Sequence, residues 1–224
     1  MSSEEIIHIA DFEIHLVKNP RAKHILLKQN TKGEIMLVRP RFCLRKQAIR
    51  FAETQLAWIR AHVQHAPEQT VFAPEMSVAL LGKTYLLKRG KTTDVVDGAL
   101  YISGDIEFFH RRVCSYAQKI LLPYIQDQVY DLTKKLGVSV GRITLKNTSS
   151  RWGSCSSSKN LSFCWKIAFA PQAVIDYLIA HEVAHLVHMN HGVQFWATVD
   201  SLTDKKKEAE RWLKANGRRL QAIK

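Results

Sequence analysis

The segment HEVAHLVHMNH, residues 181–191, places four histidines and a glutamate in an otherwise apolar stretch. On a helix, His181 and His185 lie one turn apart on the same face, where two imidazoles can bind one tetrahedral metal ion. Glu182, between them in sequence, can act as a general base on a metal-activated water, which is the chemistry of an HExxH motif. Burying these polar groups in an apolar helix is costly unless a metal pairs with them. The spacing therefore predicts a zinc ion (Zn²⁺) and a catalytic Glu182.

A third ligand requires a break in the helix. If the helix continued straight, His191 would lie about 15 Å along the axis from His181. Asn190 and Gly192 flank His191, and both residue types favour a left-handed helix end. We therefore expect the chain to turn there and His191 to complete the metal site.

Other residues compete for the third position. His188 lies one turn after His185 on the same face and is the closest rival; otherwise we expect it to line the cleft. The histidine spacing also occurs in the metzincins, but His188 stands where that pattern has glycine, and no methionine follows Met189. Downstream carboxylates offer further alternatives, namely Asp200, Glu208 and Glu210.

A second segment with chemical potential precedes the helix, at residues 147–171. The planar guanidinium of Arg151 can donate paired hydrogen bonds to a carbonyl, carboxylate or phosphate. The Trp152 ring, next to Gly153, can provide a flat apolar surface. We expect these three residues to bind substrate together with His188, and we name Arg151 and His188 as candidate oxyanion donors. The strand expected at 161–169 could pair with an extended peptide.

The elements that must position these residues follow from sequence periodicity. Alternating strands are expected within 5–38, a helix at 44–63, hairpins turning at Gly82 and Asp97-Gly98, and a helix at 106–136 containing Pro123. Strands at 143–147 and 161–170, a helix from Pro171 through the histidines, and a last helix from about Thr203 complete the pattern. The expected fold is α+β, with a strand-rich N-terminal domain containing one helix (1–104) and a catalytic domain (105–224).

Composition indicates a strongly basic globular protein. The formal net charge is +13, and basic residues gather at 18–28, 39–50 and 205–219, which would attract nucleic acid, nucleotides or other anions. No apolar run approaches the roughly 20 residues that span a bilayer, so no membrane partner is expected. The acidic start of the chain and four cysteines without a CxxC pair predict a cytoplasmic protein with free thiols.

The segments RWGSC and HEVAHLVHMNHGVQFW, with the strand and the Ala-Pro pair between them, resemble the YgjP-like metallopeptidase family. That family is related to the WLM and SprT-like zinc proteases. The resemblance implies a zincin-like catalytic part and a strand-rich N-terminal part. It also implies metal binding by His181, His185 and His191, with Glu182 catalytic. Further matches to family motif positions are Arg151, Trp152, Gly153, Phe195 and Trp196.

Three functions follow from these observations. The leading hypothesis is a zinc metallopeptidase that acts on polypeptides, with Glu182 taking a proton from water and returning it to the leaving amine. A second is a metal-dependent nucleoside triphosphate pyrophosphohydrolase, in which Arg151 receives phosphate. A third is a basic nucleic-acid-binding module with structural zinc. By analogy with the SprT-like relatives, the basic stretches could also hold a protease on nucleic acid.

Overall fold

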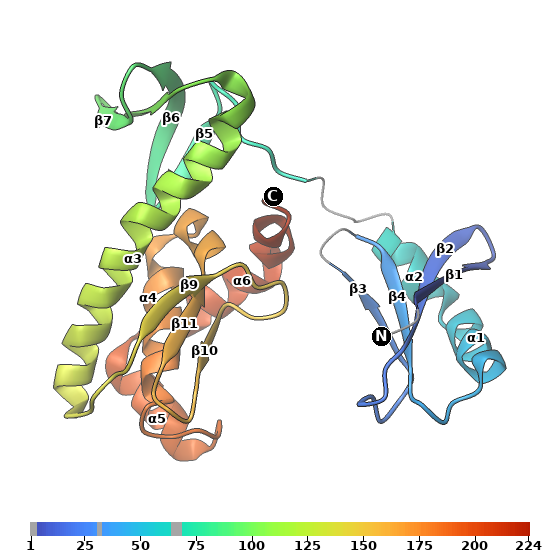
Figure 1. Ribbon diagram of the computed structural model, residues 1–224. Coiled ribbons are helices and arrows are strands. Elements are labelled where there is room, and N and C mark those ends of the chain that lie inside the picture. The colour runs from blue at the N-terminus through green and yellow to red at the C-terminus, as the bar shows by residue number, and fades with distance from the viewer. Residues whose placement is uncertain (1–3, 31–32, 64–68) are drawn as a thin grey trace. The chain divides into compact units, whose positions relative to one another are not determined.

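This computed structural model describes residues 4–30, 33–63 and 69–224 (Figure 1). The chain forms two units, each with its own hydrophobic core. The N-terminal unit comprises Met1–Gln69 and the C-terminal unit Thr70–Lys224. The division does not fall near residue 104, where the sequence pattern changes. Val78, Leu100 and Ile102 of the two later hairpins are buried in the same core as the long helix that follows them. Packing therefore assigns the hairpins to the C-terminal unit.

The N-terminal unit is a four-stranded sheet with two helices. Its strands have the order β1-β2-β4-β3, and β2 and β4 are parallel neighbours. Alternate strand residues and the helices enclose a core that includes Ile14, Leu37 and Ile59. The helix expected at 44–63 is two helices, because the backbone leaves helical geometry at Gln55 (φ −104°, ψ 20°). The elements are β1 (Glu4–Ile9), β2 (Phe12–Lys18), β3 (Leu26–Gln29), β4 (Ile35–Arg39), α1 (Arg45–Thr54) and α2 (Leu56–Val63).

The C-terminal unit begins with the two predicted hairpins, which are confirmed. Their turns need left-handed backbone at two successive residues, and Leu81-Gly82 (φ 47° and 78°) and Asp97-Gly98 (φ 47° and 76°) supply it. The sheet has the order β5-β6-β8-β7. Its strands are β5 (Ser77–Leu80), β6 (Lys83–Gly90), β7 (Asp94–Val96) and β8 (Ala99–Ser103).

Helices and a second sheet build the rest of this unit. After a short 3₁₀ turn, helix α3 (Phe109–Leu136) continues past Pro123 and ends at left-handed Gly137. The second sheet has the order β10-β11-β9, formed by β9 (Ile143–Lys146), β10 (Gly153–Cys155) and β11 (Leu161–Cys164). The last helices are α4 (Gln172–Ala184), α5 (Val193–Leu202) and α6 (Lys206–Gln221).

Two expectations about this region are wrong, and two elements were not predicted. The strand predicted at 161–170 ends at Cys164 and continues as a 3₁₀ helix, Trp165–Phe169, because a short apolar run does not by itself distinguish a buried strand from a buried helical turn. Strand β10 and helix α5 were not predicted. The helix through the histidine cluster ends early, at Ala184.

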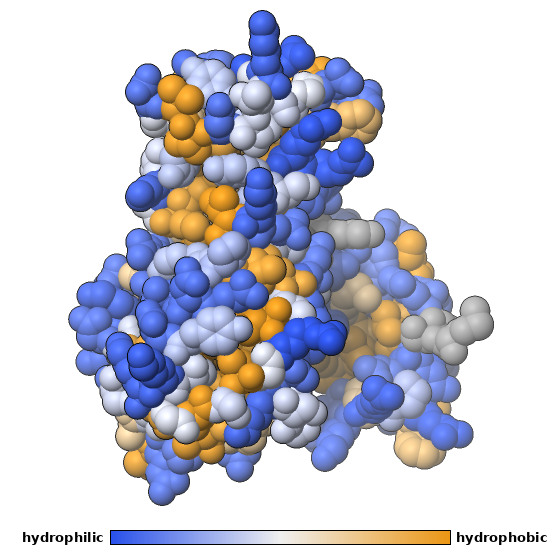
Figure 2. Space-filling view, turned by 60° about the vertical axis from the view of Figure 1, so that its left-hand side comes forward, coloured by the Kyte–Doolittle hydropathy of each residue, from blue (hydrophilic) through white to orange (hydrophobic). Residues whose placement is uncertain are grey.

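The visible surface is largely hydrophilic, with hydrophobic side chains in a broken band along the larger unit (Figure 2). Within residues 4–30, 33–63 and 69–224, no helix combines the length and the apolar character that crossing a bilayer requires.

Candidate metal centre

Helix α4 carries the HExxH residues through the middle of the C-terminal unit. It packs against α3, α5, α6 and β10, which explains why its side chains are apolar on nearly every side. Polar contacts fix its N-terminal half: Tyr124 of α3 donates a hydrogen bond to Asp176, and Gln172 donates to the Tyr124 hydroxyl at 3.1 Å. A helix that is mostly buried and held by polar contacts therefore positions His181, Glu182 and His185.

The chain turns after α4, as the third ligand requires, but at a different place from the one expected. The helix ends with His185 as its C-cap, and Leu186 N–H and Val187 N–H bond back to the carbonyls of Val183 and Ala184 at 3.0 and 3.1 Å. Asn190 and Gly192 do not adopt left-handed backbone; Gly192 instead precedes the first turn of α5 (φ −80°, ψ −176°).

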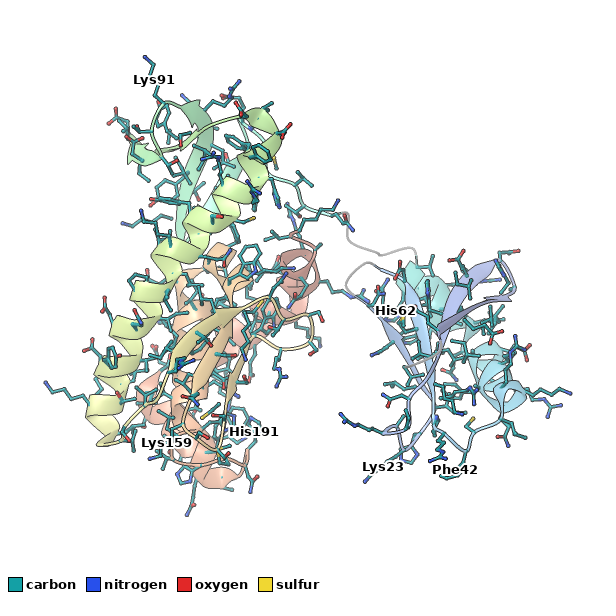
Figure 3. All side chains as sticks on the ribbon, in the orientation of Figure 1. Lys23, Phe42, His62, Lys91, Lys159 and His191 are labelled. Atoms are coloured by element: carbon teal, nitrogen blue, oxygen red, sulfur yellow. The ribbon has the colours of Figure 1, made fainter. Side chains whose placement is uncertain are left out.

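This turn brings three histidines together. The possible ligand atoms of His181, His185 and His191 all lie within 4.8 Å of one another, and we call these residues the histidine triad. His191 lies in the segment between α4 and α5 (Figure 3). The Nε2 atoms of His181 and His191 are 3.2 Å apart. Two nitrogens bound to one tetrahedral zinc ion at about 2.0–2.1 Å would be about 3.3 Å apart, so this pair already has suitable spacing.

Hydrogen bonding orients the His185 ring toward the same point. Its Nδ1 lies 3.0 Å from the backbone carbonyl of His188, which accepts the Nδ1 proton and leaves Nε2 as an unprotonated ligand atom. His188 thus contributes its carbonyl, and its side chain is outside the triad. Asp200, Glu208 and Glu210 are outside it too.

An aromatic pair from α5 supports the triad. Phe195 is fully buried, and its ring centroid lies 5.0, 4.5 and 4.6 Å from those of His181, His185 and His191. Trp196 contacts His181 and His191 from another side, and Lys206 Nζ lies 3.7 Å from the Trp196 ring centroid. Burial and the neighbouring histidines lower the pKa of His181 to about 4, so its ring is neutral at physiological pH.

Glu182 is the buried carboxylate beside the triad. Its residue exposure is 5%, and its Oε2 atom is buried without a hydrogen-bond partner among the described residues. Burial raises the pKa of Glu182 to about 8, although the positive charge of Arg151 opposes the rise. A buried acceptor without a partner is the arrangement expected of a group that receives a proton from a reactant.

The raised pKa gives a prediction for metal-free protein. Folded protein keeps a proton on Glu182 that the unfolded chain releases between pH 4.5 and about 8, so unfolding becomes easier as pH rises through this range. Relative to Glu182→Gln, wild type should lose on the order of 3 to 5 kcal/mol of unfolding free energy. Urea denaturation of both proteins in chelator, from acid to mildly alkaline pH, would measure this loss. The prediction fails if the unfolding free energies of the two proteins change with pH in the same way.

Two hollows adjoin Glu182 and share Gly153, His181 and Glu182 in their walls. One, of about 320 Å³, contains the triad and is also lined by Ser154, Cys155 and Met189. The other, of about 470 Å³, is lined by Arg151 and Trp152 together with Tyr177, Leu178, Glu210, Leu213 and Lys214. The structure therefore places Arg151, Trp152 and Gly153 beside the site, whereas His188 lines neither hollow.

Several lining residues were not foreseen from sequence. Tyr177 donates a hydrogen bond to Glu210 at 3.0 Å, which links α4 to α6 and gives Glu210 a structural partner. Tyr177 lies one turn before His181, so helical spacing alone could have indicated it. Ser154 and Cys155 belong to a strand too short to give a pattern.

Gly153 is required by the close approach of β10 to α4. A Cβ atom there would lie 2.6 Å from Cγ and Cδ of Glu182. We therefore expect Gly153→Ala to displace the carboxylate and lower hydrolysis on the order of 100-fold while zinc content is unchanged. Gly192→Ala is the matched control, because its Cβ would meet nothing within 4 Å. Equal activity of the two variants in a peptide assay would refute the role assigned to Gly153.

The chain is similar to a metallopeptidase family and to two solved metallopeptidase zymogens. The family model "YgjP-like, metallopeptidase domain" matches residues 23–216. The metallopeptidase zymogen of Pyrococcus abyssi abylysin is 17% identical, with a TM-score of 0.37, over 41% of this chain and 93% of that one. The zymogen of Methanocaldococcus jannaschii jannalysin is 24% identical, with a TM-score of 0.35, over 42% and 94%. No curated protein matches the chain.

Proposed function

The chain belongs to the YgjP-like metallopeptidase family, and we propose that it is a zinc peptidase in which the histidine triad holds the metal and Glu182 transfers the proton. The observation that carries this proposal is the convergence of three imidazoles next to a buried carboxylate without a hydrogen-bond partner. Arg151, Trp152 and Gly153 are proposed to contact the substrate, since they line the second hollow beside Glu182.

The triad suits a catalytic rather than a structural zinc ion. Structural zinc sites are closed by four protein ligands, whereas catalytic sites have three and keep one open position. This argues against a nucleic-acid-binding module in which zinc is only structural, because Glu182 would then have no role. When bound, zinc supplies a Lewis acid that polarises the scissile carbonyl, lowers the pKa of its water to about 7 and favours the ionised form of Glu182.

Glu182 is proposed to carry a proton from the attacking water to the leaving group. Its Oε2 takes a proton from the attacking water and then gives it to the leaving amine nitrogen, which must depart protonated. The burial of Glu182 keeps competing water away, and Gly153 leaves room for the carboxylate at the wall shared by both hollows. Arg151 lines the hollow beside Glu182 and stays the candidate for stabilising the negative charge on the carbonyl oxygen, whereas His188, the other candidate from the sequence, lines neither hollow.

The peptide is proposed to pair with β10 rather than with the segment 161–169. Strand β11 is buried between β10 and β9, and residues 165–169 are helical, so that segment has no free strand edge. Strand β10 is at the edge of the sheet, and its residues line the hollow that contains the triad. An extended peptide could add to this edge and present its carbonyl to the metal.

A second candidate function is hydrolysis of nucleoside triphosphates. Arg151 and Lys214 both line the hollow next to Glu182, and the Trp152 wall beside them could receive a base. Glu210 in the same hollow opposes a triphosphate by charge repulsion, so the peptidase is favoured.

One assay with two substrates separates these functions. Zinc-loaded protein would be incubated with an unfolded polypeptide and, separately, with nucleoside triphosphates, and products would be identified by mass spectrometry. The proposal expects new peptide termini and no pyrophosphate above the level of Glu182→Gln. Pyrophosphate release that depends on Glu182, without peptide cleavage, would replace the peptidase by the second candidate.

A further inference from the structure

A basic surface with an exposed aromatic ring occupies one end of the N-terminal unit. Because β2 and β4 are parallel neighbours, the loops that follow them, 19–25 and 40–44, leave the sheet at the same edge. The N–H of Asn19 bonds to the carbonyl of Arg39 at 2.9 Å, which fastens the two loop starts together. Lys23 and Phe42 lie at this end (Figure 3). We call the two loops the basic aromatic surface.

The charge of this surface is unbalanced. Residues 19–25 and 40–44 contain no aspartate or glutamate. Arg21, Lys23 and Arg41 are exposed, and within the described ranges none of them forms an ion pair. Three cations without partners on neighbouring loops favour a ligand with repeated negative charges.

The same loops, together with α1, line an open hollow of about 750 Å³. Its lining includes the apolar side chains of Ile25 and Phe51 as well as Lys23 and Arg41. Phe42 is 89% exposed, and the Arg41 guanidinium carbon lies 5.7 Å from its ring centroid. An aromatic ring left in solvent beside cations and a hollow provides a platform on which a flat group can stack.

We propose that the basic aromatic surface binds single-stranded nucleic acid, with Arg21, Lys23 and Arg41 contacting phosphates and Phe42 stacking on an unpaired base. A duplex would not offer a free base face to Phe42. A bilayer would meet a hollow lined by charged as well as apolar side chains rather than a continuous apolar face. This binding site is separate from the metal centre and does not depend on the proposed peptidase function.

The test measures binding of labelled oligothymidylate to the full chain by fluorescence anisotropy, in chelator and over a salt series. The variant Arg21→Gln/Lys23→Gln/Arg41→Gln should flatten the slope of log affinity against log salt by about 2, because each phosphate contact on a single strand contributes about 0.7. Phe42→Leu should weaken binding about 5- to 150-fold, and Phe42→Trp should retain it.

The matched control is Lys91→Gln/Lys119→Gln/Lys135→Gln, which removes the same charge from exposed positions of the C-terminal unit. It should keep the wild-type slope within about 0.5, and circular dichroism would verify the fold of every variant. The proposal is overturned by absence of binding at low salt, by equal losses in the two triple variants, or by a Phe42→Leu variant that binds like wild type. Equal affinity for duplex, or capture by phosphatidylserine vesicles without oligonucleotide binding, would also overturn it.

Discussion

Replacing His191 with alanine should lower zinc affinity at least about 100-fold. This loss is at least as large as the loss usually seen when a group that hydrogen-bonds to a metal ligand is removed. The reason is geometric: His191 is the only triad member outside α4 and its C-cap, and its Nε2 lies 3.2 Å from that of His181. Without it, two imidazoles from one helix remain. Competition with a colorimetric chelator would give the zinc dissociation constants.

His188→Ala is the matched control for this experiment. It also removes an imidazole from the same turn, but the His188 group that contacts the triad is its backbone carbonyl, which alanine retains. We expect its zinc affinity to stay within about tenfold of wild type, because removing a group that hydrogen-bonds to a metal ligand usually costs about 10- to 100-fold and this group is kept. If zinc affinity fell more in His188→Ala than in His191→Ala, His188 and not His191 would be the third ligand.

Changing Glu182 to glutamine should lower the rate of peptide hydrolysis by about 10² to 10⁴ while one zinc per chain is retained. Glutamine keeps the shape that fits against Gly153 but cannot accept the proton of the attacking water. Initial rates on a fluorogenic peptide, together with elemental analysis of the same samples, would measure both quantities.

Glu208→Gln provides the control for that variant, because it makes the same chemical change at an exposed position of α6. It should leave both rate and zinc content near those of wild type. If Glu182→Gln hydrolysed peptide within a few-fold of wild type, Glu182 could not be the general base. If Glu182→Gln lost zinc, its lower rate would reflect the loss of the metal and not the loss of proton transfer.

The sequence was most informative where local chemistry decides structure. The i and i+4 spacing of His181 and His185 places both rings on one face of any helix, and Asp97-Gly98 favours a tight hairpin whatever surrounds it. The return of the chain to His191 was anticipated as well, although Asn190 and Gly192, on which that prediction rested, do not adopt the left-handed backbone.

Tertiary packing decided the features that were missed. The apolar pattern continues through Leu186 and Val187, so periodicity gave no reason for α4 to end at Ala184. Strand β10 has three residues, and its position depends on pairing with β11. The unit boundary depends on which core the hairpin side chains enter, which a change in local pattern near residue 104 does not report.

Titration of metal-free protein with zinc, while hydrolysis of an unfolded polypeptide is followed, would show whether the bound metal makes this protein a peptidase. We expect no cleavage without metal, a linear rise in activity with added zinc, and a plateau at one zinc per chain. Cleavage at the full rate in the metal-free protein, or no cleavage at any zinc content, would contradict this expectation.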